Sequence, residues 1–147
     1  GLLSSSPYIV ACIGMLLVTR HSDRTGKRKR YLLWCMVASA LGYLLACGFA
    51  GSPVALMLAL VLATAGTFIA IPVFWTIPQS TFSGLGIATG TAAINSLGQL
   101  SGIVSPAMVG FVNDLTGISY MGMLSIVPLI LASVVLIALY VKDPARA

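Results

Sequence analysis

Few residues of this chain could do chemistry, and most of its charges are crowded into one short stretch. The segment SDRTGKRKR (residues 22–30), counted together with Arg20, holds six of the eight basic residues and one of the three acids. From Tyr31 to Asn113 the sequence contains no Asp, Glu, Lys, Arg or His. A Ser/His pair, a pair of acids or a HExxH metal motif is not found. The sequence therefore predicts no enzyme site, no metal and no cofactor.

The elements that position these residues must lie mostly out of water. Hydrophobic residues make up 59% of the chain and charged residues only 7%, whereas a soluble domain carries about 25% charged residues. The mean hydropathy is +1.04. Because the apolar runs are each about 20 residues long, they match membrane-spanning helices better than the alternating segments of about 10 residues in a membrane barrel. The predicted fold is an all-α, polytopic transmembrane bundle.

Five membrane spans are predicted, with polar or Gly/Pro-containing turns between them. The expected spans cover residues 2–19, 31–50, 54–77, 87–112 and 119–141, with a basic loop at 20–30 and a polar tail at 142–147. Lys and Arg concentrate in cytoplasmic loops, so the basic loop and the tail are expected on the cytoplasmic side. The first span then enters from outside. Since the chain opens at Gly1 without a Met or a signal peptide, it is interpreted as the tail of a longer protein.

The basic loop has two possible functions. One is a solvated positive loop that fixes topology. The other follows from a resemblance: SDRTGKR (residues 22–28) resembles a cytoplasmic motif of the major facilitator superfamily, which implies a gate. In such a gate a glycine permits a tight turn, and an Asp pairs with Arg or with a helix N-terminus. The net charge of +5 could also suggest nucleic acid, but the run lacks interleaved aromatics and lies between two apolar spans. The candidate gate residues are Asp23, Arg24, Gly26, Lys27 and Arg28.

The fourth predicted span carries two stripes at helical spacing. One stripe of small residues would let helices approach closely; its members are Gly90, Gly98, Gly102, Pro106 and Gly110. The other contains Thr91, Asn95 and Gln99, each four residues apart. An Asn or Gln inside a membrane is costly without a partner. These amides therefore either join neighbouring helices or face a cavity and contact a ligand.

The end of the third predicted span, PVFWTIPQSTFSG, places Trp75 between Pro72 and Pro78. One interpretation is an interfacial tryptophan of the aromatic belt. The other is a cavity wall on an irregular helix, where the indole would offer a flat face and one N–H donor.

The remaining reactive side chains are interpreted as structural. Cys12, Cys35 and Cys47 fall inside or at the edges of apolar spans without a CxxC motif, which is typical of buried small hydrophobes. His21, the single histidine, lies next to the basic run and is expected to be a solvated surface residue.

Taken together, these motifs resemble the C-terminal part of a transporter of the major facilitator superfamily. The motifs are SPYIVACIGM, SDRTGKRKR, FWTIP and GTAAINSLGQLSGIVSPAMVGFVNDLTG. More narrowly, the chain is similar to the anion:cation symporter family, which carries organic acids such as tartrate, glucarate, galactonate, phthalate and hydroxyphenylacetate. The resemblance covers the whole chain as helices eight to twelve of twelve.

The resemblance implies a mechanism and a set of substrate contacts. Two six-helix halves would rock around a midplane site to take up an organic anion with a proton across a bacterial inner membrane. Trp75 and Asn95 would contact the substrate, with Thr76, Gln79, Thr91 and Gln99 as second choices. The implied partners are a small organic anion, a proton, the lipid bilayer and an N-terminal half that precedes these residues.

The residues also limit this mechanism. Proton coupling needs a titrating group in the cavity, and the spans after Tyr31 contain none. The coupling acid and any substrate-binding Arg are therefore expected in the preceding half, and the 147 residues are not expected to transport alone. Two alternatives stay open: a drug or sugar carrier of the same superfamily, and a membrane scaffold that does not transport.

Overall fold

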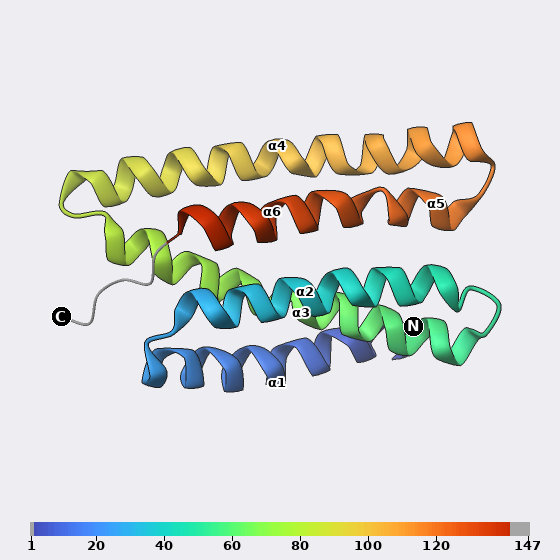
Figure 1. The fold of residues 1–147 in the computed structure, drawn as a ribbon, viewed down its shortest axis with the longest axis horizontal. Coiled ribbons are helices and arrows are strands. Elements are labelled where there is room, and N and C mark those ends of the chain that lie inside the picture. The colour runs from blue at the N-terminus through green and yellow to red at the C-terminus, as the bar shows by residue number, and fades with distance from the viewer. Residues whose placement is uncertain (1, 142–147) are drawn as a thin grey trace.

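Residues 2–141 fold into six α-helices, and the last two follow one another along one line beside the others (Figure 1). The computed structural model describes the backbone of residues 2–141 and the side chains of residues 7–118 and 120–141. The helices are α1 (Leu2–Thr25), α2 (Arg28–Gly48), α3 (Pro53–Thr81), α4 (Leu85–Thr116), α5 (Ser119–Leu124) and α6 (Ile126–Tyr140). The described residues form no strand, which confirms the predicted all-α class.

Helices α2 and α3 form the centre of the bundle (Figure 1). Helix α1 packs mainly on α3, and α6 packs on α2. Helix α4 crosses the whole length of the molecule at one edge, where it contacts α5 and the end of α3. None of the α4 residues is buried, so most of its surface faces away from the other helices described.

The turn between α1 and α2 is much shorter than the loop predicted at 20–30. Helix α1 continues through Thr25 and α2 begins at Arg28, so only Gly26 and Lys27 lie between the two helices. Arg and Lys are good helix formers, so the run of charge does not end the helix. Gly26 does, because its φ of 67° is a conformation that other residues adopt only at a cost. Its N–H bonds the carbonyl of Ser22 at 2.9 Å.

Among the described residues, three helices are long and apolar enough to cross a membrane by length and composition. They are Arg28–Gly48, Pro53–Thr81 and Tyr120–Tyr140, with mean hydropathies of 1.7, 2.5 and 2.6. They correspond to the second, third and fifth predicted spans, the last of which divides at Ser125 into α5 and α6. The first and fourth predicted spans are helical as α1 and α4, but they fall outside this set. Their membrane crossing stays a prediction.

Close approach of two backbones defines the contact between α2 and α3. A Cβ on Gly66 would lie 2.7 Å from the carbonyl oxygen of Cys35, and a Cβ on Gly42 would clash with the backbone nitrogen of Ala63. Ser39, which is 2% exposed, places its hydroxyl 3.0 Å from the carbonyl oxygen of Ala63 and 2.7 Å from the Thr67 hydroxyl. Small residues at helix contacts permit such packing in membranes.

We expect Gly42→Ala to destabilise the bundle by about 1–3 kcal/mol, because the new methyl group meets backbone atoms of Ala63 that cannot move independently. Thermal unfolding of the detergent-solubilised protein measures this change. Gly48→Ala in the same helix is the control, since a Cβ there meets nothing within 4 Å. Equal stability of the two variants would contradict the close contact.

Candidate substrate cavity

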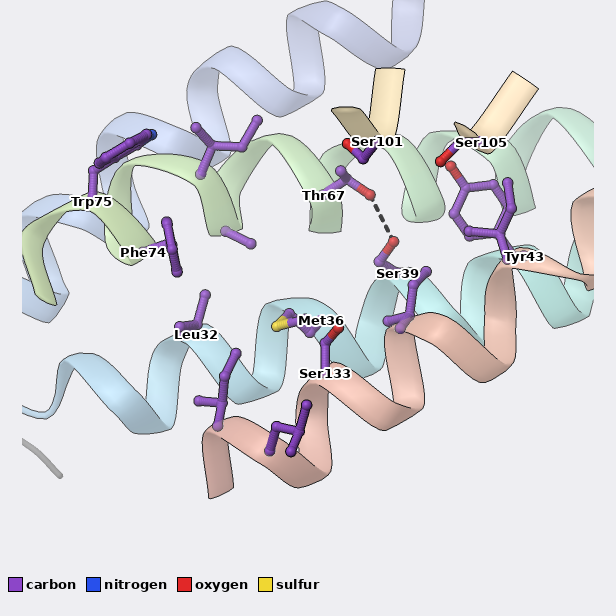
Figure 2. A pocket seen from close by; sticks show the side chains of 16 residues that line it. Leu32, Met36, Ser39, Tyr43, Thr67, Phe74, Trp75, Ser101, Ser105 and Ser133 are labelled. Carbon is purple, nitrogen blue, oxygen red and sulfur yellow. Dashed lines mark hydrogen bonds between the residues drawn. The ribbon is translucent and has the colours of Figure 1, made fainter. Parts of the chain in front are cut away.

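A cavity of about 690 Å³ lies between α2, α3, α4 and α6. Helices α2 and α3 form one wall, α6 forms a second, and two serines of α4 reach it from the edge (Figure 2). The wall is mostly apolar, with polar groups at a few points. Clefts of this size and lining are typical of small-molecule sites.

One end of the cavity is aromatic. Phe74 and Trp75 are neighbours on α3, with ring centroids 5.6 Å apart and an interplanar angle of 71°. Figure 2 shows both rings at the end of the cavity away from the α4 serines. The structure thus places Trp75 on a cavity wall, the second of its two predicted environments. An aromatic face suits a planar solute or an apolar ring surface.

The opposite end of the cavity carries hydroxyl groups (Figure 2). The polar lining residues are Ser39, Tyr43, Thr67, Ser101, Ser105 and Ser133. Several of these hydroxyls already donate to backbone carbonyls: Ser101 to Gly98 at 2.6 Å and Ser133 to Leu129 at 2.9 Å. Their remaining lone pairs would accept hydrogen bonds. No Asp, Glu, Lys, Arg or His is among the described lining residues, so the polar groups of this mostly apolar cavity are uncharged.

The other predicted substrate contacts do not line this cavity. Thr76 and Thr91 donate to their own helix backbones, at 2.7 Å to Val73 and 2.6 Å to Ile87. Gln79, Asn95 and Gln99 are exposed. Each residue of a helix turns by about 100°, so the stripe of Asn95 and Gln99 lies far around α4 from Ser101. Their contact with substrate stays a prediction about the open face of α4.

Sequence reasoning missed the hydroxyl-bearing residues of the cavity. Ser101 and Ser105 are one helical turn apart, and this spacing was a usable signal on α4. Ser39, Thr67 and Ser133 are isolated polar residues in apolar helices. Only the packing of α2, α3 and α6 brings them together.

The small-residue stripe of α4 contacts little within the described chain. A Cβ on Gly98, Gly102 or Gly110 would meet nothing within 4 Å, whereas Gly90 packs against the ring of Phe82. Pro106 is exposed. The predicted packing role of this stripe therefore concerns neighbours other than the helices described and stays a prediction.

Among the candidate gate residues, Arg28 joins three helices at the end of the bundle. Its Nη2 lies 3.4 Å from Oδ1 of Asp23 on α1, and its Nη1 donates to the carbonyl oxygen of Thr76 on α3 at 3.3 Å. Arg24 and Lys27 are exposed. Because Thr76 follows Trp75 directly, Arg28 connects the α1–α2 turn to the helix segment that forms the aromatic end of the cavity.

We expect Arg28→Gln to cost roughly 1–3 kcal/mol in free energy of unfolding, because it removes charge-assisted hydrogen bonds to two helices. Asp23→Asn should cost less than about 1 kcal/mol, since exposed ion pairs contribute little and Asp23 is 49% exposed. Arg20→Gln removes an exposed charge at the same end and serves as the control. An equal loss of stability in the Asp23 and Arg28 variants would show that the Thr76 contact contributes nothing.

Apolar helices of membrane-spanning length around an uncharged, partly aromatic cavity are typical of integral membrane proteins that bind small molecules. The comparisons with known proteins agree with this class. The family model of the major facilitator superfamily matches residues 1–147, and the chain belongs to this superfamily.

The relatives found among curated proteins are named as transporters. The chain is 34% identical over its full length to a protein of Agrobacterium vitis named as a tartrate transporter, and it covers 32% of that protein. It is 38% identical over 80% of its length to a quinolone resistance transporter of Acinetobacter baumannii, covering 27% of it. It is 32% identical over 74% of its length to the inner membrane transport protein RhmT of Escherichia coli strain K12, covering 25% of it.

The chain thus spans about a third or less of the length of these curated relatives. No solved structure matches it significantly.

Proposed function

We propose that the chain is the C-terminal part of a secondary transporter that takes up a small organic anion with a proton by alternating access. The observation that carries the proposal is the cavity beside Trp75, with an aromatic end and a hydroxyl end between four helices. The full-length match to a relative named as a tartrate transporter supports an organic acid as the substrate class. We propose on these grounds that the whole transporter belongs to the anion:cation symporter family.

The chemistry of the cavity suits the uncharged parts of such a substrate. Hydroxyls and the indole N–H can bond the hydroxyl and carbonyl groups of an organic acid, while the aromatic faces contact its carbon skeleton. Since the described lining carries no cation, the carboxylate charge needs a partner elsewhere. We assign that partner, and the acid that binds the coupled proton, to helices that precede these residues.

The exposed face of α4 is evidence that another part of the transporter packs against it. Asn95 and Gln99 are exposed there, and amides in a membrane are costly without partners. We propose that α4 faces the preceding half of the transporter, with these amides at the substrate path and the small-residue stripe against a neighbouring helix. The chain covers 32% of the tartrate-transporter relative, so that relative is long enough to contain such a half.

The proposed topology follows from the charges. Helices α1 to α4 and the α5–α6 segment would be five spans, corresponding to helices eight to twelve of the superfamily, in a bacterial inner membrane. The α1–α2 turn and the C-terminal tail would lie in the cytoplasm, because positive loops stay inside. Arg28 would then lock the cytoplasmic end in one state of the cycle and release it in another.

A drug-like substrate is the second candidate. The uncharged cavity with two adjacent aromatic rings also suits a planar aromatic solute, and one relative is named as a quinolone resistance transporter. The two candidates differ in the direction of transport. An organic acid would accumulate in vesicles with a proton gradient, whereas a drug would be expelled.

We expect Trp75→Ala to raise the KM for tartrate uptake about tenfold, equivalent to a loss of about 1.4 kcal/mol of binding energy, because it removes the aromatic face of the cavity. Trp75→Phe should retain most of the affinity. Uptake is measured in proteoliposomes containing the full transporter under an inward proton gradient, with Phe111→Ala, an aromatic deletion outside the cavity, as the control. An unchanged KM in Trp75→Ala would place the substrate elsewhere.

Uptake by the isolated 147 residues at the rate of the full transporter would refute the need for a preceding half.

A further inference from the structure

A second groove, of about 580 Å³, lies between α2 and α6 and is separate from the substrate cavity. It is lined by Lys29, Arg30, Leu33, Trp34, Val37 and Val134. Helix α2 presents Leu32, Met36 and Ser39 to the cavity instead. None of the groove residues lines the cavity, so the groove does not belong to the site described above.

The groove is basic at one end and apolar along the rest. Lys29 and Arg30 lie in the first turn of α2, and Leu33, Trp34 and Val37 follow in the next two turns. At a rise of 1.5 Å per residue, Val37 lies roughly 10 Å further along the helix axis than Arg30. A ligand that fits must combine an anionic group with an apolar chain in line with it.

The two cations at the basic end differ in their contacts with the protein. The ammonium of Lys29 donates to the carbonyl oxygen of Ala138 at 2.8 Å, which joins the start of α2 to α6 and shapes the groove. Arg30 is exposed, and within the part of the chain that the structure describes its guanidinium makes no hydrogen bond or ion pair. A guanidinium binds phosphate through two parallel N–H groups, so Arg30 can receive an anion without breaking a contact.

Trp34 marks the depth at which such a ligand would lie. Its side chain is 69% exposed one turn beyond Arg30, and an amphipathic indole is typical of the headgroup level of a membrane. Arg30 would lie at the phosphate level and Trp34 just below it. Leu33, Val37 and Val134 would lie along the beginning of an acyl chain.

We propose that this groove binds one anionic phospholipid, with its phosphate on Arg30 and an acyl chain along Leu33, Val37 and Val134. Charge complementarity carries the choice of occupant. The stretch from residue 20 to residue 30 holds six basic residues and one acid, and basic pockets between membrane helices on the cytoplasmic side bind anionic headgroups. A zwitterionic lipid would bring its own cationic group beside the phosphate and so carry no net charge to complement the basic end of the groove. A free anion would leave the apolar wall without a contact.

Tryptophan fluorescence tests this proposal directly. The full transporter, with every tryptophan except Trp34 replaced by Phe, is reconstituted in phosphatidylcholine vesicles that contain a small fraction of brominated phospholipid, whose bromines quench indole fluorescence on contact. We expect brominated phosphatidylglycerol to quench Trp34 at a concentration about fivefold lower than brominated phosphatidylcholine, the preference expected for one Arg contact to an anionic lipid.

Arg30→Gln should abolish this preference, whereas the matched control Arg20→Gln, which removes a charge at the same end of the bundle outside the groove, should keep it. Arg30 is exposed, so its substitution should leave the thermal unfolding profile unchanged. Equal quenching by both lipids, or an unchanged preference in Arg30→Gln, would overturn the proposal. An equal loss in Arg20→Gln would overturn it in favour of diffuse charge attraction, and relief of quenching by inorganic phosphate would overturn it in favour of a free-anion site.

Discussion

The rest of the structure depends on the close approach of the α2 and α3 backbones. Gly42 and Gly66 leave no room for a Cβ at this contact, and the buried hydroxyl of Ser39 joins the two helices through the Ala63 carbonyl. In a membrane, apolar side chains gain little by leaving lipid for protein, so packing and hydrogen bonds must hold helices together. Helix α1 then packs on α3 and α6 on α2, and the cavity forms where this central pair meets α6 and α4.

This contact also positions the polar side of the cavity. Thr67 lies at the same contact as Ser39, and both line the cavity, so the hydroxyl end rests on the most tightly packed part of the bundle. The aromatic end lies further along α3, between Pro72 and Pro78. A proline inside a helix removes one backbone hydrogen bond. The cavity thus has one end on a close-packed contact and one end on a helix segment whose backbone is less completely bonded.

The α1–α2 turn is connected to this less bonded segment through Arg28. Its guanidinium bonds the backbone of Thr76 rather than a side chain, so the contact follows the position of α3 itself. Any movement of α1 or α2 at that end must either carry the Trp75 segment along or break the contact. In the proposed transport cycle, forming and breaking this contact would close and open the cytoplasmic end of the bundle.

The sequence predicted some of these features because the signal was local. The excess of apolar residues indicated helices in a membrane, Gly26 marked a turn, and a cavity wall was one of the two interpretations of Trp75 between two prolines. The basic run was predicted as a loop because its charge was given more weight than its helix propensity. That prediction was wrong in extent, because only two residues separate α1 from α2. The cavity serines were not predicted, because Ser133 and Ser39 line one cavity only through packing between segments far apart in the chain. On α4 the sequence favoured the amides Asn95 and Gln99 as substrate contacts, whereas Ser101 and Ser105 are the α4 residues that line the cavity.

If substrate occupies the cavity between α2, α3, α4 and α6, as proposed, it should protect thiols introduced into the cavity from chemical labelling. Cys12, Cys35 and Cys47 are first replaced by alanine, and single cysteines are then introduced by Ser133→Cys in the cavity and Ser52→Cys in the exposed α2–α3 turn. Maleimide labelling of each variant of the full transporter in membranes is compared with and without tartrate. The account predicts that tartrate slows labelling in Ser133→Cys and leaves labelling in Ser52→Cys unchanged. Equal labelling rates with and without tartrate in Ser133→Cys, in a transporter that still takes up tartrate, would contradict it.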